Sequence, residues 1–243
     1  PAVDRIRRRI DHPGAYDAVV VLDCSNIDRI GRLADDAAQF RITINIDHHL
    51  SNTGFGDIRH VDTSACSTAE IVYRLVRSME IPMDQDIATA IYTGILTDTG
   101  SFRFANTNRT AFSVCLDLIE SGVDPYTVAQ HVYGTYSIGR IKLLNLALDS
   151  IEVSADGALS FMMLTRDMLE ETGTQPEDVD GMINYAKSIK DVKVAVLIQE
   201  RRESGKPLGK NNFYVSLRSD GSVDVAALAA SFGGGGHHRA AGF

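Results

Sequence analysis

The sequence predicts an α/β protein in which a doubly wound, mostly parallel sheet is followed by a smaller α/β domain. Two apolar runs, residues 18–22 and 42–46, are each followed by an aspartate, and a weak helical pattern over residues 30–40 separates them. Runs that are apolar on both faces are typical of buried parallel strands, and a strand-helix-strand order places them in one sheet. From residue 151 the pattern changes to strands that alternate with turns and one helical stretch.

The middle of the chain predicts a series of helices. Residues 67–70 read Ser-Thr-Ala-Glu, a capping box in which a hydroxyl and a carboxylate satisfy the free amides at the start of a helix. Further helices are expected over residues 84–96, from residue 106 or 107 to Gly122, and from Pro125, where proline suits the first helical position.

The domain boundary is expected in a long helix over residues 136–148. Beyond it we expect three strands, over residues 159–164, 192–199 and 213–217. A helical stretch is expected over residues 176–188, a polar loop over residues 203–212 and a last helix over residues 225–232. The prediction is therefore a first domain over residues 1–130, a linker helix over residues 131–150 and a second domain over residues 151–243.

Composition and charge exclude several classes of protein. The chain has 243 residues, 44% of them hydrophobic, and a formal net charge of −8. Its apolar runs are far shorter than the roughly 20 residues of a membrane helix, so no membrane partner is expected. An acidic surface repels long duplex DNA, which favours small substrates bound in a local positive pocket. Three widely spaced cysteines without a CxxC pair indicate a reduced, cytoplasmic protein.

A cluster of carboxylates and histidines carries the chemistry. Asp23 and Asp47 follow the two predicted parallel strands, where open α/β sheets bind their ligands. His48 and His49 come next, and Asp98 lies in a later turn before Gly100. A single aspartate after a strand is more often a turn residue or helix cap. The combination instead indicates a set of oxygen and imidazole ligands, which suits Mn²⁺ better than Ca²⁺ or a thiolate-bound metal.

A glycine-rich tail is the second candidate site. Asp224 is expected to cap a helix that leads into four glycines, residues 233–236, which His237, His238 and Arg239 follow. Four glycines alone are most often a flexible linker, and the spacing matches neither a Walker loop nor a dinucleotide fingerprint. With the three following side chains, the tail predicts a pocket in which backbone amides bind an anion.

These motifs together resemble the DHH phosphoesterase superfamily. Asp23, Asp-His-His at 47–49 and the segment 94–104, which contains Asp98, resemble its second, third and fourth motifs. Residues 232–242 resemble the signature of its associated C-terminal nucleic-acid-binding domain. The resemblance covers nearly the whole chain and applies in particular to the branch of nano-RNases and pAp phosphatases, where pAp is adenosine with 3′ and 5′ phosphates.

The resemblance implies a role for each candidate residue. Asp23 would bridge two Mn²⁺ ions, with Mg²⁺ or Co²⁺ as substitutes, while His48 and Asp98 complete the second ion's ligands. Asp47 would hold an imidazole by a hydrogen bond, and His49 would face the scissile phosphate. Arg103 would act in catalysis as a phosphate clamp. Substrate would be bound by Arg218, Gly234, Gly235, Gly236 and His237, with His238 and Arg239 as neighbouring candidates.

The activity implied is metal-assisted hydrolysis without a covalent intermediate. The substrates would be short single-stranded RNA, cut to mononucleotides, or the 3′-phosphate of pAp, and a homodimer is a further expectation. The alternatives are a phosphodiesterase for cyclic or linear dinucleotides and a nucleotide-binding fragment without activity. A family II pyrophosphatase would lack the glycine tail, and a processive exonuclease of the RecJ type would carry an added DNA-binding domain.

The sequence departs from the superfamily pattern at its beginning. Members start with a strand followed by a histidine and Asp-x-Asp, which bind the first metal ion. Before Asp23 there is only Asp11-His12-Pro13, in an expected turn, and Asp84-Gln85-Asp86 begins a predicted helix. We therefore expect that the N-terminal part of the first domain is missing. If the given chain is the whole molecule, we expect it to hold at most part of the second metal site and to be inactive.

Overall fold

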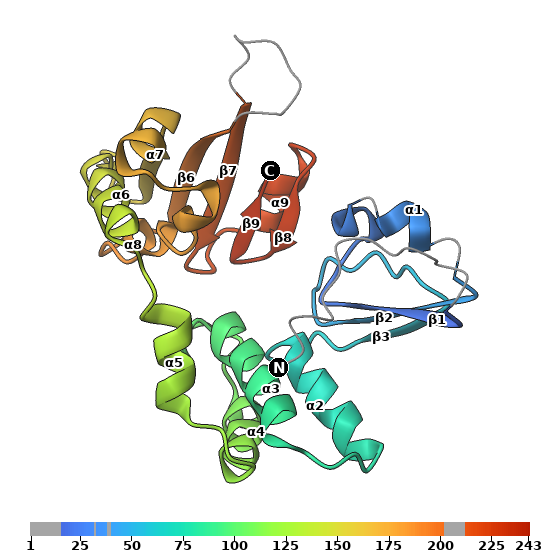
Figure 1. The fold of residues 1–243 in the computed structure, drawn as a ribbon. Coiled ribbons are helices and arrows are strands. Elements are labelled where there is room, and N and C mark those ends of the chain that lie inside the picture. Colours follow the sequence, from blue (N-terminus) through green and yellow to red (C-terminus); the bar gives the residue numbers. More distant parts are fainter. Residues whose placement is uncertain (1–15, 32, 38–39, 202–211) are drawn as a thin grey trace. The chain divides into compact units, whose positions relative to one another are not determined.

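The computed structural model describes residues 16–31, 33–37, 40–201 and 212–243 (Figure 1). Asp11 and His12, and almost all of the predicted loop 203–212, lie outside the described residues. The chain forms two compact units, Pro1–Gly134 and Thr135–Phe243, which are described separately.

The first unit contains a parallel sheet whose three strands lie in the order β1-β2-β3. These strands are β1 (Ala18–Leu22), β2 (Ile42–Asp47) and β3 (Ile58–Val61). Leu22 pairs with Ile46, so Asp23 and Asp47 lie at the same, carboxyl edge of the sheet. The sequence prediction of parallel strands that present these two aspartates together is confirmed.

The helical pattern predicted over residues 30–40 corresponds to a short helix, α1 (Leu33–Ala37). The 3-10 helix η3 (Ile27–Ile30) precedes it, and Gly31, whose φ is 63°, lies between the two. The predicted strand-helix-strand order from β1 to β2 is therefore confirmed, with a helix that is shorter in the described residues than the pattern predicts.

Four helices complete the first unit: α2 (Thr68–Ser78), α3 (Gln85–Asp98), α4 (Arg109–Glu120) and α5 (Pro125–Tyr133). Ser67 caps α2 by accepting from the Glu70 amide, and the Glu70 carboxylate accepts from the Cys66 amide at 2.8 Å. Ile71 of α2 packs against Ile46 of β2, while α2, α3, α4 and α5 enclose a separate core around Ile95 and Leu118. The sheet edge and the start of α2 therefore form one packed structure.

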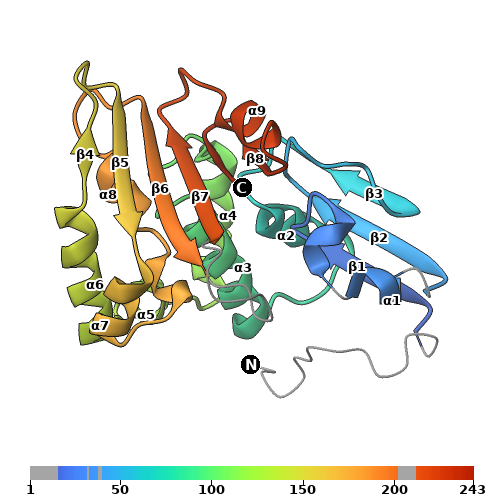
Figure 2. The same cartoon turned by 90° about the horizontal axis from the view of Figure 1, so that it is seen from above.

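The second unit is a six-stranded mixed sheet with helices on both faces. Its helices are α6 (Ile138–Asp149), α7 (Arg166–Thr172), η4 (Pro176–Val179), α8 (Ile183–Lys187) and α9 (Val225–Ala230). Its strands are β4 (Glu152–Val153), β5 (Leu159–Leu164), β6 (Val194–Arg201), β7 (Asn212–Ser219), β8 (Gly235–His237) and β9 (Ala240–Gly242). The strand order is β4-β5-β6-β7-β9-β8, and only β5 and β6 are parallel neighbours (Figure 2).

Alternate residues of β6 face opposite cores in this unit. Ala195 and Leu197 pack with α6, α7 and α8, whereas Val194 and Val196 pack with α9. The α/β class predicted from the sequence is confirmed, with a parallel first sheet and a mixed second sheet. Within the described part of the chain, no helix combines the length and the apolar character that crossing a membrane requires.

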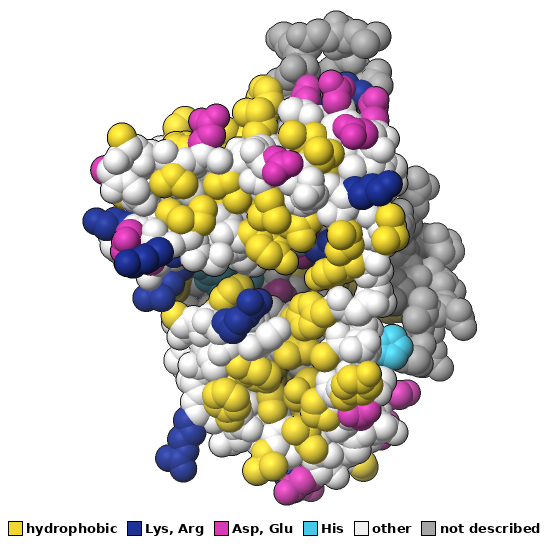
Figure 3. Space-filling model, turned by 90° about the vertical axis from the view of Figure 1, so that its left-hand side faces the viewer, with side chains coloured by type: hydrophobic (Ala, Val, Ile, Leu, Met, Phe, Trp, Pro, Cys, Tyr) yellow, Lys and Arg dark blue, Asp and Glu magenta, His cyan; other side chains and the backbone are white. Residues whose placement is uncertain are grey.

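Apolar, basic and acidic side chains are interspersed on the face of the protein drawn in Figure 3. Among the described residues visible there, lysines and arginines do not form one continuous belt. The formal net charge of −8 gives the chain as a whole little electrostatic attraction for the backbone of a long nucleic acid.

Candidate metal centre

Asp23 is the first candidate ligand and has an unusual backbone conformation. It follows β1 with φ of 57°, in the left-handed region that aspartate tolerates better than most side chains. Its amide donates to the Ile46 carbonyl at 3.0 Å, and the Thr68 hydroxyl donates to its Oδ1 at 2.7 Å. The Asp23 side chain is nevertheless 59% exposed, so a carboxylate held at one oxygen presents its other side to solvent.

His48 lies between Asp23 and Asp98. Its Nδ1 is 3.3 Å from the Ala65 carbonyl oxygen, which can only accept, so Nδ1 carries a proton. Its Nε2 lies 3.4 Å from Asp98 Oδ2 and 3.8 Å from Asp23 Oδ1. Distances of this size occur between two atoms that coordinate one divalent cation, so His48 can share an ion with either carboxylate. Among the described residues, Asp23, Asp47 and His49 form a set of three whose ligand atoms all lie within 4.8 Å of one another.

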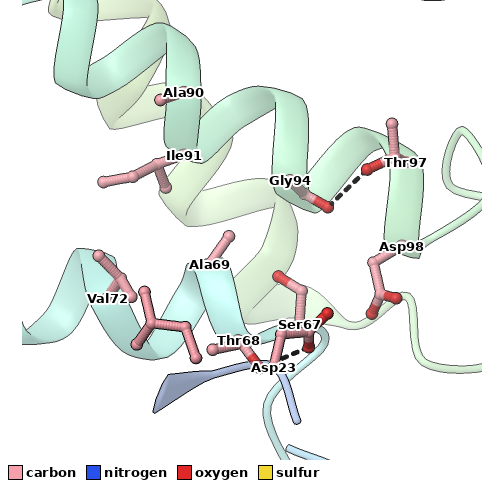
Figure 4. A pocket seen from close by; sticks show the side chains of 11 residues that line it. Asp23, Ser67, Thr68, Ala69, Val72, Ala90, Ile91, Gly94, Thr97 and Asp98 are labelled. Atoms are coloured by element: carbon pink, nitrogen blue, oxygen red, sulfur yellow. Dashed lines mark hydrogen bonds between the residues drawn. The ribbon is translucent and has the colours of Figure 1, made fainter. Parts of the chain in front are cut away.

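Asp98 ends α3 and points toward Asp23 and Ser67 (Figure 4). Burial raises the pKa of its carboxyl, the nearby His48 lowers it and Asp23 raises it. The carbonyl end of α3 adds partial negative charge at the same place. A cation is the group that relieves this concentration of negative charge, and the mixed oxygen and imidazole donors fit a divalent ion.

Asp47 and His49 form a second, hydrogen-bonded pair. Asp47 is fully buried and accepts from Asn52 Nδ2 at 2.6 Å, from the His48 amide at 2.8 Å and from His49 Nδ1 at 2.7 Å. Burial would raise the pKa of Asp47, but the hydrogen bonds from Asn52 and His49 outweigh it and the pKa is lowered. Asp47 is therefore ionised at neutral pH and fixes a proton on His49 Nδ1.

A cavity of about 360 Å³ opens beside Asp23 and Asp98, between β1 and the helices α2 and α3 (Figure 4). Its walls are mainly apolar and include Leu22, Ala69, Val72, Ala90 and Ile91. The cavity lets a group approach the candidate ligands from the side of these helices.

Arg103, the predicted phosphate clamp, follows a tight left-handed turn. Gly100, Ser101 and Phe102 have φ values of 56°, 59° and 61°, and residues with a Cβ rarely adopt this conformation. The exposed Arg103 side chain donates from Nε to the Gly100 carbonyl at 2.8 Å. Its guanidinium therefore stays close to the turn that follows Asp98, and its role as a clamp remains a prediction.

Arg218 lies on β7 in the second unit and is half-buried. Its Nη1 donates to the Leu217 carbonyl at 3.0 Å. Burial lowers the pKa of this guanidinium, while Asp180 and Tyr214 raise it. An arginine remains charged despite such a shift, so a buried positive charge is available in this unit for an anion.

The glycine-rich tail is an ordered hairpin and not a linker. Gly233 has φ of 81° and ends α9, and the Gly234 amide donates to the Ala229 carbonyl at 2.9 Å, as in a Schellman cap. A Cβ on Gly234 would lie 2.1 Å from the Gly242 carbonyl oxygen, and one on Gly236 would lie 2.4 Å from that of Ala240. Gly233 and Gly235 have no atom within 4 Å of such a Cβ. The folding of the hairpin therefore requires several glycines, whatever they bind.

The last three predicted residues belong to this hairpin. His237 ends β8 and is half-buried, and His238 and Arg239 form the exposed turn that leads to β9. A Cβ on Gly221 would meet the Arg239 guanidinium at 2.6 Å, so this side chain lies over Gly221. Their part in binding an anion is not tested by this geometry.

Three polar residues at the first site were missed by the sequence analysis: Asn52, Thr68 and Asn106. Each donates a hydrogen bond to one of the three carboxylates described above. Thr68 is the second residue of the capping box, and Asn52 follows Asp47 by five positions. Their types and positions were visible in the sequence, but their direction toward the carboxylates depends on the fold.

Comparisons with known proteins agree with this arrangement. Residues 2–95 match the model of the DHH family, N-terminal domain, and residues 158–243 match that of the DHHA1 domain. The bifunctional oligoribonuclease and PAP phosphatase NrnA of Thermus thermophilus is 32% identical over 230 residues, which are 95% of this chain and 65% of that protein. The protein of the same name from Bacillus subtilis is 29% identical over 92% of this chain and 68% of its own length.

A solved structure gives the same result for the fold. The crystal structure of an exopolyphosphatase-related protein from Bacteroides fragilis superposes with a TM-score of 0.84 at 30% identity, over 95% of this chain and 66% of that chain. The chain thus spans about two thirds of the length of these relatives. On these matches, the chain belongs to the DHH family and carries a DHHA1 domain in its second unit.

Proposed function

We propose that this protein is a metal-dependent phosphoesterase that hydrolyses short oligoribonucleotides to mononucleotides, removes the 3′-phosphate of pAp, or does both. The observation that carries the proposal is the position of His48 Nε2 at the edge of the parallel sheet, 3.8 Å from Asp23 Oδ1 and 3.4 Å from Asp98 Oδ2. The names of the relatives from Thermus thermophilus and Bacillus subtilis support this choice of substrates.

Asp23, His48 and Asp98 would hold the divalent ion, for which we propose Mn²⁺, with Mg²⁺ or Co²⁺ as substitutes. When bound, such an ion activates water and neutralises charge on the phosphate oxygens. We propose two ions, and Asp23, the most exposed of the three ligands, is the residue that both would share.

His49 would exchange a proton with the leaving oxygen of the phosphate ester. Asp47 would stabilise the protonated imidazole by the 2.7 Å hydrogen bond to Nδ1, and the proton would be transferred through Nε2. Arg103 would bind a non-bridging phosphate oxygen, since guanidinium and phosphate form two-pronged hydrogen bonds. Catalysis thus combines charge on one side of the phosphate with proton transfer on another.

The second unit would bind the end of the substrate that is not cut. Arg218 supplies a buried positive charge, and Gly235 leaves its backbone open to close approach. His237, His238 and Arg239, with the neighbouring Gly234 and Gly236, complete the proposed anion site. A grip on a second phosphate explains a preference for substrates only a few nucleotides long.

We also propose a cytoplasmic location, and a homodimer as the assembly to test. Burial raises the pKa of the Cys66 thiol to about 12 and that of Cys115 to about 11, so both remain protonated and unreactive. Buried protonated thiols are compatible with a reducing compartment.

The test is an assay with Mn²⁺ on a panel of pAp, di- to pentaribonucleotides, a cyclic dinucleotide and a long single strand. We expect mononucleotides from the short RNAs or adenosine monophosphate from pAp, detected by chromatography. Exclusive cleavage of dinucleotides would favour the dinucleotide phosphodiesterase, and binding without hydrolysis would favour the inactive nucleotide-binding fragment. Preference for the longest strand would contradict the proposal.

A further inference from the structure

A short buried segment, residues 65–68, contacts two of the three candidate metal ligands, His48 and Asp23. The Ala65 carbonyl accepts from His48 Nδ1 at 3.3 Å, and the Thr68 hydroxyl donates to Asp23 at 2.7 Å. Residues 65–68 are all buried, and they lead into α2, whose Ile71 packs against the sheet. This segment therefore fixes two of the three candidate ligands directly.

Asp98 lies on a different helix and is tied to the same segment through Asn106. The side-chain amide of Asn106 donates from Nδ2 to the Cys66 carbonyl at 2.7 Å. The same Nδ2 lies 3.1 Å from the Asp98 carbonyl and 3.3 Å from Asp98 Oδ2. Asn106 thus bridges the residue before the α2 cap and the carboxylate at the end of α3.

The orientation of the Asn106 amide is determined by these contacts. All three atoms that face Nδ2 are oxygens that accept hydrogen bonds, so a reversed amide would place oxygen against oxygen. Asn106 Oδ1 is buried and has no hydrogen-bond partner among the described residues. The Nδ2 donor of Asn106 therefore has acceptors, whereas its buried Oδ1 has no donor among the described residues. A buried oxygen without a hydrogen bond destabilises the fold, which indicates that the contacts of Nδ2 are the important ones.

We propose that Asn106 is a positioning residue of the metal centre, which holds the Asp98 carboxylate in register with Asp23 and His48. The inference rests on the proposed function, because it assumes that these three residues bind a divalent ion. Residues that hold a metal ligand by a hydrogen bond typically change metal affinity by about 10–100-fold when they are replaced. Asn106 performs this role for a ligand that residues 65–68 do not contact directly.

The test compares Asn106→Leu and Asn106→Ala with Asn108→Ala. Both Asn106 variants remove the donor, one filling the space and one leaving it empty. Asn108 lies two positions further on and caps α4 by accepting from the Ala111 amide at 2.9 Å, and its other side-chain contact among the described residues is with the Ser64 carbonyl and not with Asp98. The control therefore loses a structural hydrogen bond in the same loop without affecting the ligand.

Mn²⁺ binding is measured by calorimetry and by the electron paramagnetic resonance signal of free Mn²⁺, with thermal melting as the test of folding. We expect the Asn106 variants to bind Mn²⁺ about 10–100-fold more weakly, and the Asn108 variant to bind it as the unchanged protein does. Where activity is present, high Mn²⁺ should restore kcat in the Asn106 variants, which a purely structural defect would not allow.

Equal Mn²⁺ binding by the unchanged protein and both folded Asn106 variants would overturn this inference and leave the proposed function intact. An unchanged protein that binds no Mn²⁺ would overturn the proposed function and this inference with it. If both Asn106 variants fail to fold while Asn108→Ala folds, Asn106 is required for the fold itself, and a local positioning role is excluded.

Discussion

The carboxyl edge of the first sheet and the glycine hairpin of the second unit are both short sequence motifs, but they are built by opposite means. At the sheet edge, buried side chains such as Asp47 and His48 are fixed by hydrogen bonds from several elements. In the hairpin, Gly234 and Gly236 are defined by the absence of a side chain, because backbone atoms occupy the place of a Cβ. Substitutions at the sheet edge should therefore act by removing hydrogen-bonding or charged groups. Substitutions in the hairpin should act by causing steric clashes.

The largest effect should come from Asp98→Asn, which keeps the shape of a candidate ligand and removes its charge. Loss of a ligand removes several kcal/mol of charge stabilisation, so kcat/KM at fixed Mn²⁺ should fall by about 10⁴-fold. Steady-state kinetics on the cleaved substrate, with Mn²⁺ titration, measure the change. Activity within tenfold of the unchanged protein would remove Asp98 from the centre.

A smaller effect is expected for His49→Gln, which removes the proton donor but none of the three proposed ion ligands. Loss of a general acid typically lowers kcat by about 10²–10³-fold. Mn²⁺ affinity should change much less than in Asp98→Asn, and this separates the two roles at one sheet edge. An unchanged kcat would show that His49 does not transfer the proton.

The hairpin is tested by Gly236→Ala beside Gly235→Ala. A Cβ at Gly236 would collide with the Ala240 carbonyl and with Ala241, so the free energy of unfolding should fall by about 1–3 kcal/mol. Gly235 has open space, and its variant should change stability by less than about 0.5 kcal/mol while weakening substrate binding. Urea unfolding and KM measure the two effects; equal stability of both variants would contradict the packing argument.

The smallest effect concerns Asp62, an aspartate that follows β3 at the same sheet edge but is not a candidate ligand. Hydrogen bonds from Ser64 and Arg74 lower the pKa of Asp62 far below its usual value. A lowered folded pKa stabilises the protein at neutral pH, and this contribution is lost as the pH falls below about 4 and through the folded value. Asp62→Asn should therefore cost about 1 kcal/mol or less at pH 7 and progressively less in acid.

Urea unfolding at a series of pH values measures this difference, and Mn²⁺ binding serves as its control. Binding should be unchanged, because Arg74 and Ser64 already occupy the Asp62 carboxylate. A loss of Mn²⁺ binding in Asp62→Asn would extend the metal centre to the third strand.

The sequence by itself determined the α/β class, the two strands that end at Asp23 and Asp47, and the start of α2 at its capping box. These features are local, because apolar periodicity and helix capping depend on neighbouring residues. It also indicated which residue types could form the metal centre, since Asp-His-His after a strand is a distinctive combination.

The tertiary structure decided which polar residues meet. Asp23, Asp47 and Asp62 all follow or end a parallel strand, yet Asp62 pairs with Arg74 while Asp23 faces His48. Asn106 reaches Cys66, a residue 40 positions earlier, and its contact with Asp98 could not be read from local pattern. Such contacts depend on strand register and on how α2 and α3 pack, and these are set by the whole core. For the same reason, only the fold revealed that Gly235 and Gly236 belong to strand β8, which pairs with β9 at the edge of the second sheet.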